Sequence, residues 1–75
     1  MPGALTSFHR DRAKSWRREI VQARIKLADS ALSRTQRAEL WQVVDVREWC
    51  LKMLVTDYPA ELERIDREIE QELRR

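Results

Sequence analysis

The side chains best suited to catalysis or metal binding are scarce in this 75-residue sequence. His9 is the only histidine and Cys50 the only cysteine, so no Cys/His group has the spacing of zinc ligands. A nucleophilic site needs a base beside the nucleophile and a third group that orients the base, and no such set is identifiable. Cys50 also has no second cysteine with which to form an internal disulfide. The pattern predicts no catalytic residue, no metal site and no cofactor.

The densest cluster of carboxylates lies near the end of the sequence, where acidic residues alternate with arginines. Its members are Glu61, Glu63, Asp66, Glu68, Glu70 and Glu72. General acid–base chemistry needs such groups in a pocket, and a chain this short has little room for one. A di-iron helical site needs Glu-x-x-His motifs, and the sequence has none. The carboxylates are therefore interpreted as solvated helix residues, and the protein is not expected to be an enzyme.

A second group of charges, near the start, is basic. Its members are Arg10, Arg12, Lys14, Arg17, Arg18 and Arg24, of which the first, fourth and last recur every seven residues. Residues 1–26 hold seven basic and two acidic side chains, and residues 56–75 hold four basic and seven acidic ones, within a net charge of +2. One hypothesis is that the basic row contacts nucleic-acid phosphates, with salt-sensitive affinity and no sequence preference. The alternatives are a solvated face balanced by the acidic segment, and head-to-tail pairing of two copies.

Large apolar side chains offer another route to binding. The sequence has three tryptophans, more than a small core commonly needs. Trp16 is predicted to be buried, whereas Trp41 and Trp49 fall at the margins of an apolar helix face, the latter beside Met53. A partly exposed tryptophan is a good interface anchor because it combines a large rigid surface with one N–H donor; the alternative is that both only cover the edges of the core. The predicted protein-binding residues are Trp41, Trp49, Met53, Val21 and Ile25.

The elements that must position these side chains are helices. Between Leu5 and Tyr58 there is neither glycine nor proline, and apolar residues recur at helical spacing. A first helix is predicted from about residue 7 to 31, with Thr6 or Ser7 as its N-cap. It carries two apolar stripes separated by arginines, the second of which includes Val21 and Ile25, so it is expected to touch two neighbours.

A second helix is predicted over about residues 34–56. Ser33 and Gln36 fit a capping box at its start, with Thr35 as the alternative cap and one unbroken helix through residues 29–35 as the alternative structure. More than half of its circumference is apolar, so it is expected to be the central helix. The broad apolar face comprises Leu40, Val43, Val44, Cys50, Leu51, Leu54 and Val55, with Val46, Trp49 and Met53 on one flank.

A third helix is predicted over about residues 59–74. Pro59 disfavours the α conformation of Tyr58, which ends the second helix, and itself suits a first helical turn. The apolar stripe of this helix is narrow and too short for a free coiled coil, so the helix must dock on something. The stripe consists of Leu62, Ile65, Ile69 and Leu73.

These observations predict one all-α domain over residues 1–75, with a flexible segment 1–6 and a long antiparallel hairpin followed by a shorter third helix. So small a core commonly needs reinforcement, and self-association, as a homodimer, is the expected form. The expected function is non-catalytic protein binding, with nucleic-acid binding through the first helix as the alternative. The start lacks the regions of a signal peptide and the apolar cluster 49–55 is too short to span a bilayer, so we expect a cytoplasmic protein with no membrane partner.

Overall fold

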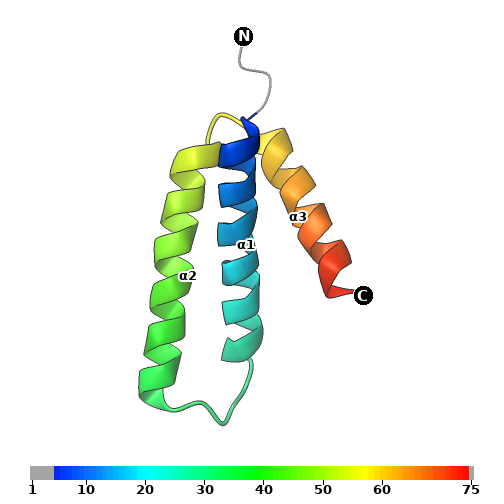
Figure 1. The fold of residues 1–75 in the computed structure, drawn as a ribbon. Coiled ribbons are helices and arrows are strands. Elements are labelled where there is room, and N and C mark those ends of the chain that lie inside the picture. Colours follow the sequence, from blue (N-terminus) through cyan, green and yellow to red (C-terminus); the bar gives the residue numbers. More distant parts are fainter. Residues whose placement is uncertain (1–4, 75) are drawn as a thin grey trace.

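The computed structural model describes residues 5–74, which form three α-helices and no strand (Figure 1). The helices are α1 (Ser7–Leu27), α2 (Arg34–Val55) and α3 (Pro59–Leu73). Helices α1 and α2 form a long antiparallel hairpin, and α3 returns along α1 in the same direction as α1. The predicted all-α, three-helix fold is confirmed, while residues 1–4 of the predicted flexible segment lie outside the described residues.

The turn of the hairpin is built by side chains rather than by glycine. Helix α1 ends at Leu27, earlier than the predicted end near Ala31. The Asp29 carboxylate accepts a hydrogen bond from the backbone N–H of Ala31 at 2.9 Å, a local turn that competes with helix continuation. Arg37 of α2 donates to the carbonyl oxygens of Leu27 and Asp29, both at 3.1 Å, and so satisfies acceptors left at the helix end. This turn excludes one unbroken helix through residues 29–35.

Helix α2 begins at the predicted capping box. The Ser33 hydroxyl accepts from the backbone N–H of Gln36 at 3.1 Å, and the Gln36 side chain accepts from the backbone N–H of Ser33 at 2.9 Å. Ser33 rather than Thr35 is therefore the N-cap. Helix α3 has Pro59 in its first turn, as predicted, and no side-chain hydrogen bond caps it.

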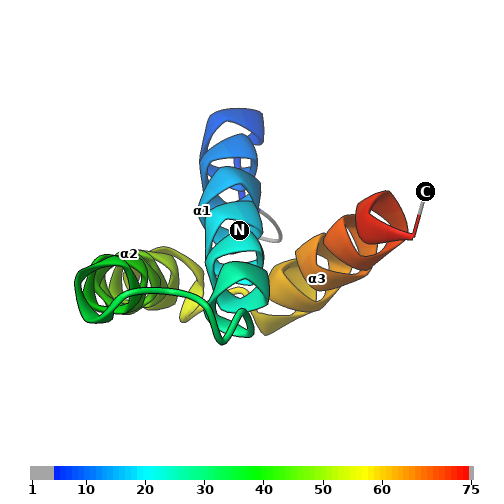
Figure 2. The same cartoon turned by 90° about the horizontal axis from the view of Figure 1, so that it is seen from below.

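The core is small, and α1 supplies its centre. Helix α1 packs extensively on α2 and less on α3, whereas α2 and α3 barely touch. Figure 2 shows α1 between the other two helices. The prediction that the second helix is central is wrong, because α1 contacts both other helices, whereas Val43 and the flank residues Val46, Trp49 and Met53 of α2 are exposed. The buried residues are Ala13, Ile20 and Ala23 of α1, Val44, Leu51 and Val55 of α2, and Ile65 and Ile69 of α3.

Candidate protein-docking surface

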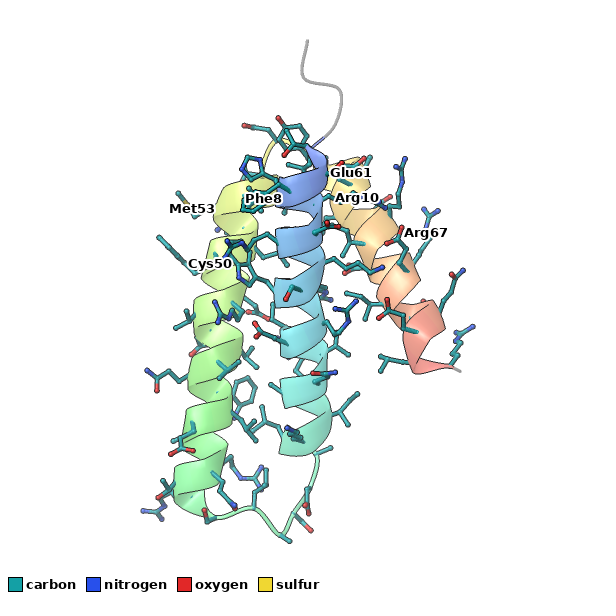
Figure 3. All side chains as sticks on the ribbon, viewed as in Figure 1. Phe8, Arg10, Cys50, Met53, Glu61 and Arg67 are labelled. Atoms are coloured by element: carbon teal, nitrogen blue, oxygen red, sulfur yellow. The ribbon has the colours of Figure 1, made fainter. Side chains whose placement is uncertain are left out.

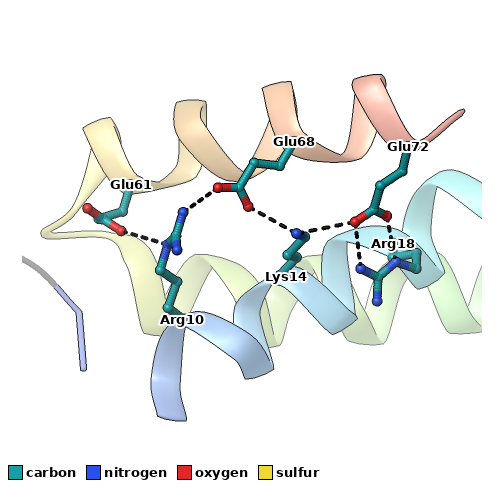
Figure 4. A network of polar contacts seen from close by, with 6 residues as sticks. All are labelled: Arg10, Lys14, Arg18, Glu61, Glu68 and Glu72. Carbon is teal, nitrogen blue, oxygen red and sulfur yellow. Dashed lines mark hydrogen bonds and ion pairs between the residues drawn. The ribbon is translucent and has the colours of Figure 1, made fainter. Parts of the chain in front are cut away.

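The basic side of α1 faces α3 and forms a ladder of ion pairs with it (Figure 4). Arg10 lies 2.5 Å from Glu68, and the Lys14 ammonium lies 3.0 Å from Glu68 and 3.2 Å from Glu72. Arg18 donates two hydrogen bonds to Glu72, both at 3.1 Å. The ladder therefore joins successive turns of two parallel helices and fixes their register.

At the top of the ladder lies Glu61, the one charged residue that is buried among residues 5–74. Its carboxylate is 3.4 Å from Arg10 and 3.5 Å from Arg64. Glu61 also sits in the first turn of α3, where the helix dipole favours negative charge. Figure 3 shows Arg10 and Glu61 side by side between α1 and α3.

The ladder shifts the pKa values of Lys14, Arg18, Glu68 and Glu72 in the directions that keep these groups charged. The hydrogen bond from Lys14, assisted by Arg10, lowers the pKa of Glu68 below its ordinary value. The hydrogen bonds from Arg18 and then Lys14 lower the pKa of Glu72. Reciprocally, Glu68 and Glu72 raise the pKa of Lys14. At neutral pH these groups are thus ionised and offset one another.

The other basic residues proposed to contact phosphate are also engaged within the chain. Arg17 donates to Asp66 of α3 at 2.6 Å, and Arg24 pairs with Glu48 of α2. The Arg12 guanidinium lies 5.4 Å and 5.9 Å from the centres of two aromatic rings, within the range of cation–π interactions. These rings belong to Phe8 and Trp16. All six residues of the predicted nucleic-acid set therefore have partners in their own chain, with which a phosphate group would compete.

Unlike the basic residues of α1, several apolar side chains of α2 are exposed to solvent, on the side of the helix that points away from α1. Met53 is 66% exposed and Trp49 64%, with Val46 at 48%. Figure 3 shows Met53 pointing away from the rest of the molecule. The stretch from Val43 to Met53 covers about 15 Å of helix. We call this surface the outer face of α2; it consists of Val43, Val46, Trp49, Cys50 and Met53.

The structure does not bring the five predicted protein-binding residues onto one surface. Trp49 and Met53 lie together on the outer face of α2. Trp41, 46% exposed, lies elsewhere on α2, where an α1 guanidinium is 6.0 Å from its ring. Ile25 is exposed on α1, whereas Val21 is half-buried and packs against the core. The predicted set is thus divided among three places.

Sequence reasoning missed part of the outer face. Val43, which the sequence pattern places on the broad apolar face of the second helix, is 40% exposed. Phe8 was not singled out, although it is exposed beside Arg12. The available signal was a seven-residue spacing, Val43 to Cys50 and Val46 to Met53, which places these four residues on one side of a helix.

A groove of about 420 Å³ also opens where α2 and α3 diverge. Its floor is apolar, with Leu51 and Val55 from α2 and Leu62 from α3, and Arg17 and Glu48 stand at its edge. Leu51 and Val55 are already buried in the core. The groove is therefore a notch between helices, and it offers less bare apolar surface than the outer face of α2.

Comparisons with protein-family models, with curated proteins and with solved structures gave no significant match. Within residues 5–74, no group of three or more histidine, cysteine or carboxylate side chains is arranged to hold a metal ion. None of the helices described there combines the length and the apolarity of a bilayer-crossing segment.

Proposed function

We propose that this chain is a non-catalytic protein-binding module that docks through the outer face of α2, acting as a small adaptor, an assembly factor or an inhibitor of a larger protein. One observation carries the proposal. Trp49 and Met53, both about two-thirds exposed, stand side by side with exposed valines on a helix whose opposite side already supplies the core.

Burial of this surface supplies the driving force for docking. Fully burying one large apolar side chain favours association by about 1.5–3 kcal/mol. Tryptophan and methionine are among the residue types enriched at protein interfaces. Charged residues beside the outer face, including Asp45 and Lys52, are exposed and set the orientation of a partner rather than its affinity.

Nucleic-acid binding is the weaker proposal. It relies on the basic residues of α1, and phosphate would have to displace carboxylates held at 2.5–3.2 Å by Arg10 and Lys14. Within the part of the chain that the structure describes, no comparable intramolecular partner covers the outer face of α2, where Trp49 and Met53 remain exposed.

A photo-crosslinking amino acid tests the proposal without knowledge of the partner. We expect a crosslinker in place of Val46 to form light-dependent protein adducts in cells that express the chain. The same crosslinker in place of Arg67 should form none, although the side chain of Arg67 is 76% exposed and so more accessible than Val46, because Arg67 lies on α3 (Figure 3).

A third variant ties the adduct to the apolar surface. The changes Trp49→Ser and Met53→Ser, added to the Val46 crosslinker, should abolish the adduct while the far-UV circular dichroism is preserved, because both side chains are exposed. Equal adducts at positions 46 and 67, or adducts that survive the two serine substitutions, would contradict the proposed docking surface.

A further inference from the structure

We infer that a second copy of this chain occupies the outer face of α2, so that two α2 helices pack antiparallel across a two-fold axis. The inference rests on the docking surface of the proposed function, and it takes a second copy of this chain, rather than a larger protein, as the partner that covers this surface. Three observations carry it: the amount of exposed surface, the heptad spacing of the outer face, and two unpaired charges beside it.

The exposed area of one chain is too large for a compact monomer. The chain exposes 5847 Å². A folded monomer of 9.0 kDa is expected to expose about 4,900 Å². The excess over the whole chain, roughly 1,000 Å², is enough to contain the ~800 Å² that each partner buries in a standard protein interface.

The outer face of α2 has the spacing of a coiled-coil seam. Val46 and Met53 are seven residues apart and occupy one seam position, and Gln42 and Trp49 occupy the other. In an antiparallel pair the two seam positions alternate across the interface. Val46 then packs against Trp49 of the second copy, and Met53 packs against Gln42 of the second copy.

The residues beside the seam complete the match. One edge is apolar, with Val43 and Cys50, and the other carries Asp45 and Lys52. In antiparallel packing each edge meets the same edge of the other helix, so Val43 meets Cys50 of the second copy and Asp45 meets Lys52 of the second copy. Among the described residues neither Asp45 nor Lys52 forms an ion pair, although most charged residues of α1 do. An acid and a base on the same edge of the helix become complementary to each other when a two-fold rotation generates the second copy. This self-complementarity favours a second copy over an unrelated partner.

Charge reversal tests this register. Asp45→Lys sets lysine against Lys52 of the second copy, and Lys52→Asp sets aspartate against Asp45. We expect each variant alone to dimerise about tenfold more weakly than the wild type. An equimolar mixture should recover wild-type affinity, because every pair across the interface is then opposite in charge. Sedimentation equilibrium measures both; unchanged single variants, or a mixture no tighter than its components, would overturn the register.

A disulfide provides an independent test. In Val43→Cys the new thiol faces Cys50 of the second copy, so mild oxidation should give a covalent dimer. The bond cannot form within one helix, because the two thiols are separated by about 10 Å along its axis, beyond disulfide reach. The wild type should crosslink far more slowly, since its two Cys50 residues are offset by ~7.5 Å along the helices. Arg67→Cys is the control for random oxidation, and equal crosslinking by it, or by the wild type, would overturn the inference.

The outcomes for the dimer and for the proposed function are separable. A chain that sediments as a monomer at all concentrations, yet still forms adducts with another protein through position 46, overturns the dimer and leaves the docking surface intact. A monomer that forms no adduct at position 46 overturns both.

Discussion

Helices α2 and α3 both pack against α1, but different interactions stabilise the two contacts. The contact of α1 with α2 is mainly apolar and is lined by ion pairs only at its edges, such as Arg47 with Glu19 at 2.8 Å. Among residues 5–74, the contact of α1 with α3 has two buried apolar residues on the α3 side, Ile65 and Ile69, beside a long ladder of ion pairs. Exposed ion pairs contribute little free energy, although they select geometry. The ladder therefore sets the register of α3, and the two isoleucines supply most of its attachment.

The same comparison explains where binding capacity is left. The basic surface of α1 looks like a site for an anionic partner in the sequence, but α3 takes up most of its charges. The breadth of the apolar face of α2 suggests a central helix in the sequence, but α1 covers only one side of α2. Most basic residues of α1 are thus paired within the chain, whereas the apolar outer face of α2 remains exposed to solvent.

Removing the same side chain from both contacts sharpens the comparison and gives the largest expected effects. Ile20 and Ile65 are both 0% exposed. Ile20→Ala should cost about 2–5 kcal/mol of unfolding free energy. That is comparable with the ~3–5 kcal/mol that so small a core supplies, so the whole chain should unfold. Ile65→Ala should instead release α3 and leave the hairpin folded. Circular dichroism and hydrogen exchange resolved by segment distinguish the two.

An exposed isoleucine provides the control for these changes. Ile25 is on the same helix as Ile20 but is 57% exposed, so Ile25→Ala should change the unfolding free energy by less than about 0.5 kcal/mol. If Ile65→Ala raised exchange in α1 and α2 as much as in α3, the hairpin would depend on α3 and the two contacts would be one cooperative unit.

The ladder itself should give a smaller, pH-dependent effect. Because the folded-state pKa of Glu68 is below its ordinary value of 4.5, its contribution is present above that value and is lost as the pH falls through the folded pKa. Because the pKa of Lys14 is raised above 10.5, its contribution is complete below 10.5 and is lost as the pH rises through the folded pKa. Stability should therefore be level near neutral pH and fall towards both extremes.

A variant separates the ladder from the other carboxylates. Glu68→Gln should lower stability at neutral pH and reduce the further loss below pH 4.5, as measured by urea unfolding across pH. Glu63→Gln is the matched control, since Glu63 is 73% exposed and its nearest basic group is 3.9 Å away. Identical pH profiles for the two variants would show that the ladder contributes nothing beyond ordinary surface charge.

The sequence was sufficient for the elements whose causes are local. Ser33 with Gln36 and Pro59 act within one turn of their own positions, so two helix starts were predictable. The end of α1 was not, because Arg37, which caps it, comes from the following helix. One interpretation of the sequence is that the acidic segment balances the basic one, and the ion pairs between α1 and α3 form this balance.

The arrangement of the helices was harder to predict because it depends on which apolar stripes meet. Both α1 and α2 carry more apolar surface than one contact can cover, and the width of the α2 face pointed to a central position. The acidic side of α3 instead matches the basic side of α1, which places α3 on α1 and leaves Val46, Trp49 and Met53 bare. The outer face of α2 is therefore exposed because of ion pairs between residues far apart in the sequence, which the apolar pattern within each helix does not reveal.

The smallest expected effect concerns nucleic acid. We expect no gel shift of generic duplex DNA by the wild type at physiological salt, because the α1 guanidinium groups already have partners and the net charge is only +2. Changing Arg10, Arg17 and Arg24 together to Gln should leave this result unchanged. A salt-sensitive shift by the wild type that the triple variant loses without unfolding would instead show that phosphate displaces the ladder. In that event the basic residues of α1 would be able to bind an anionic partner. The ion pairs between α1 and α3 would then be exchangeable, unlike the apolar contact between α1 and α2.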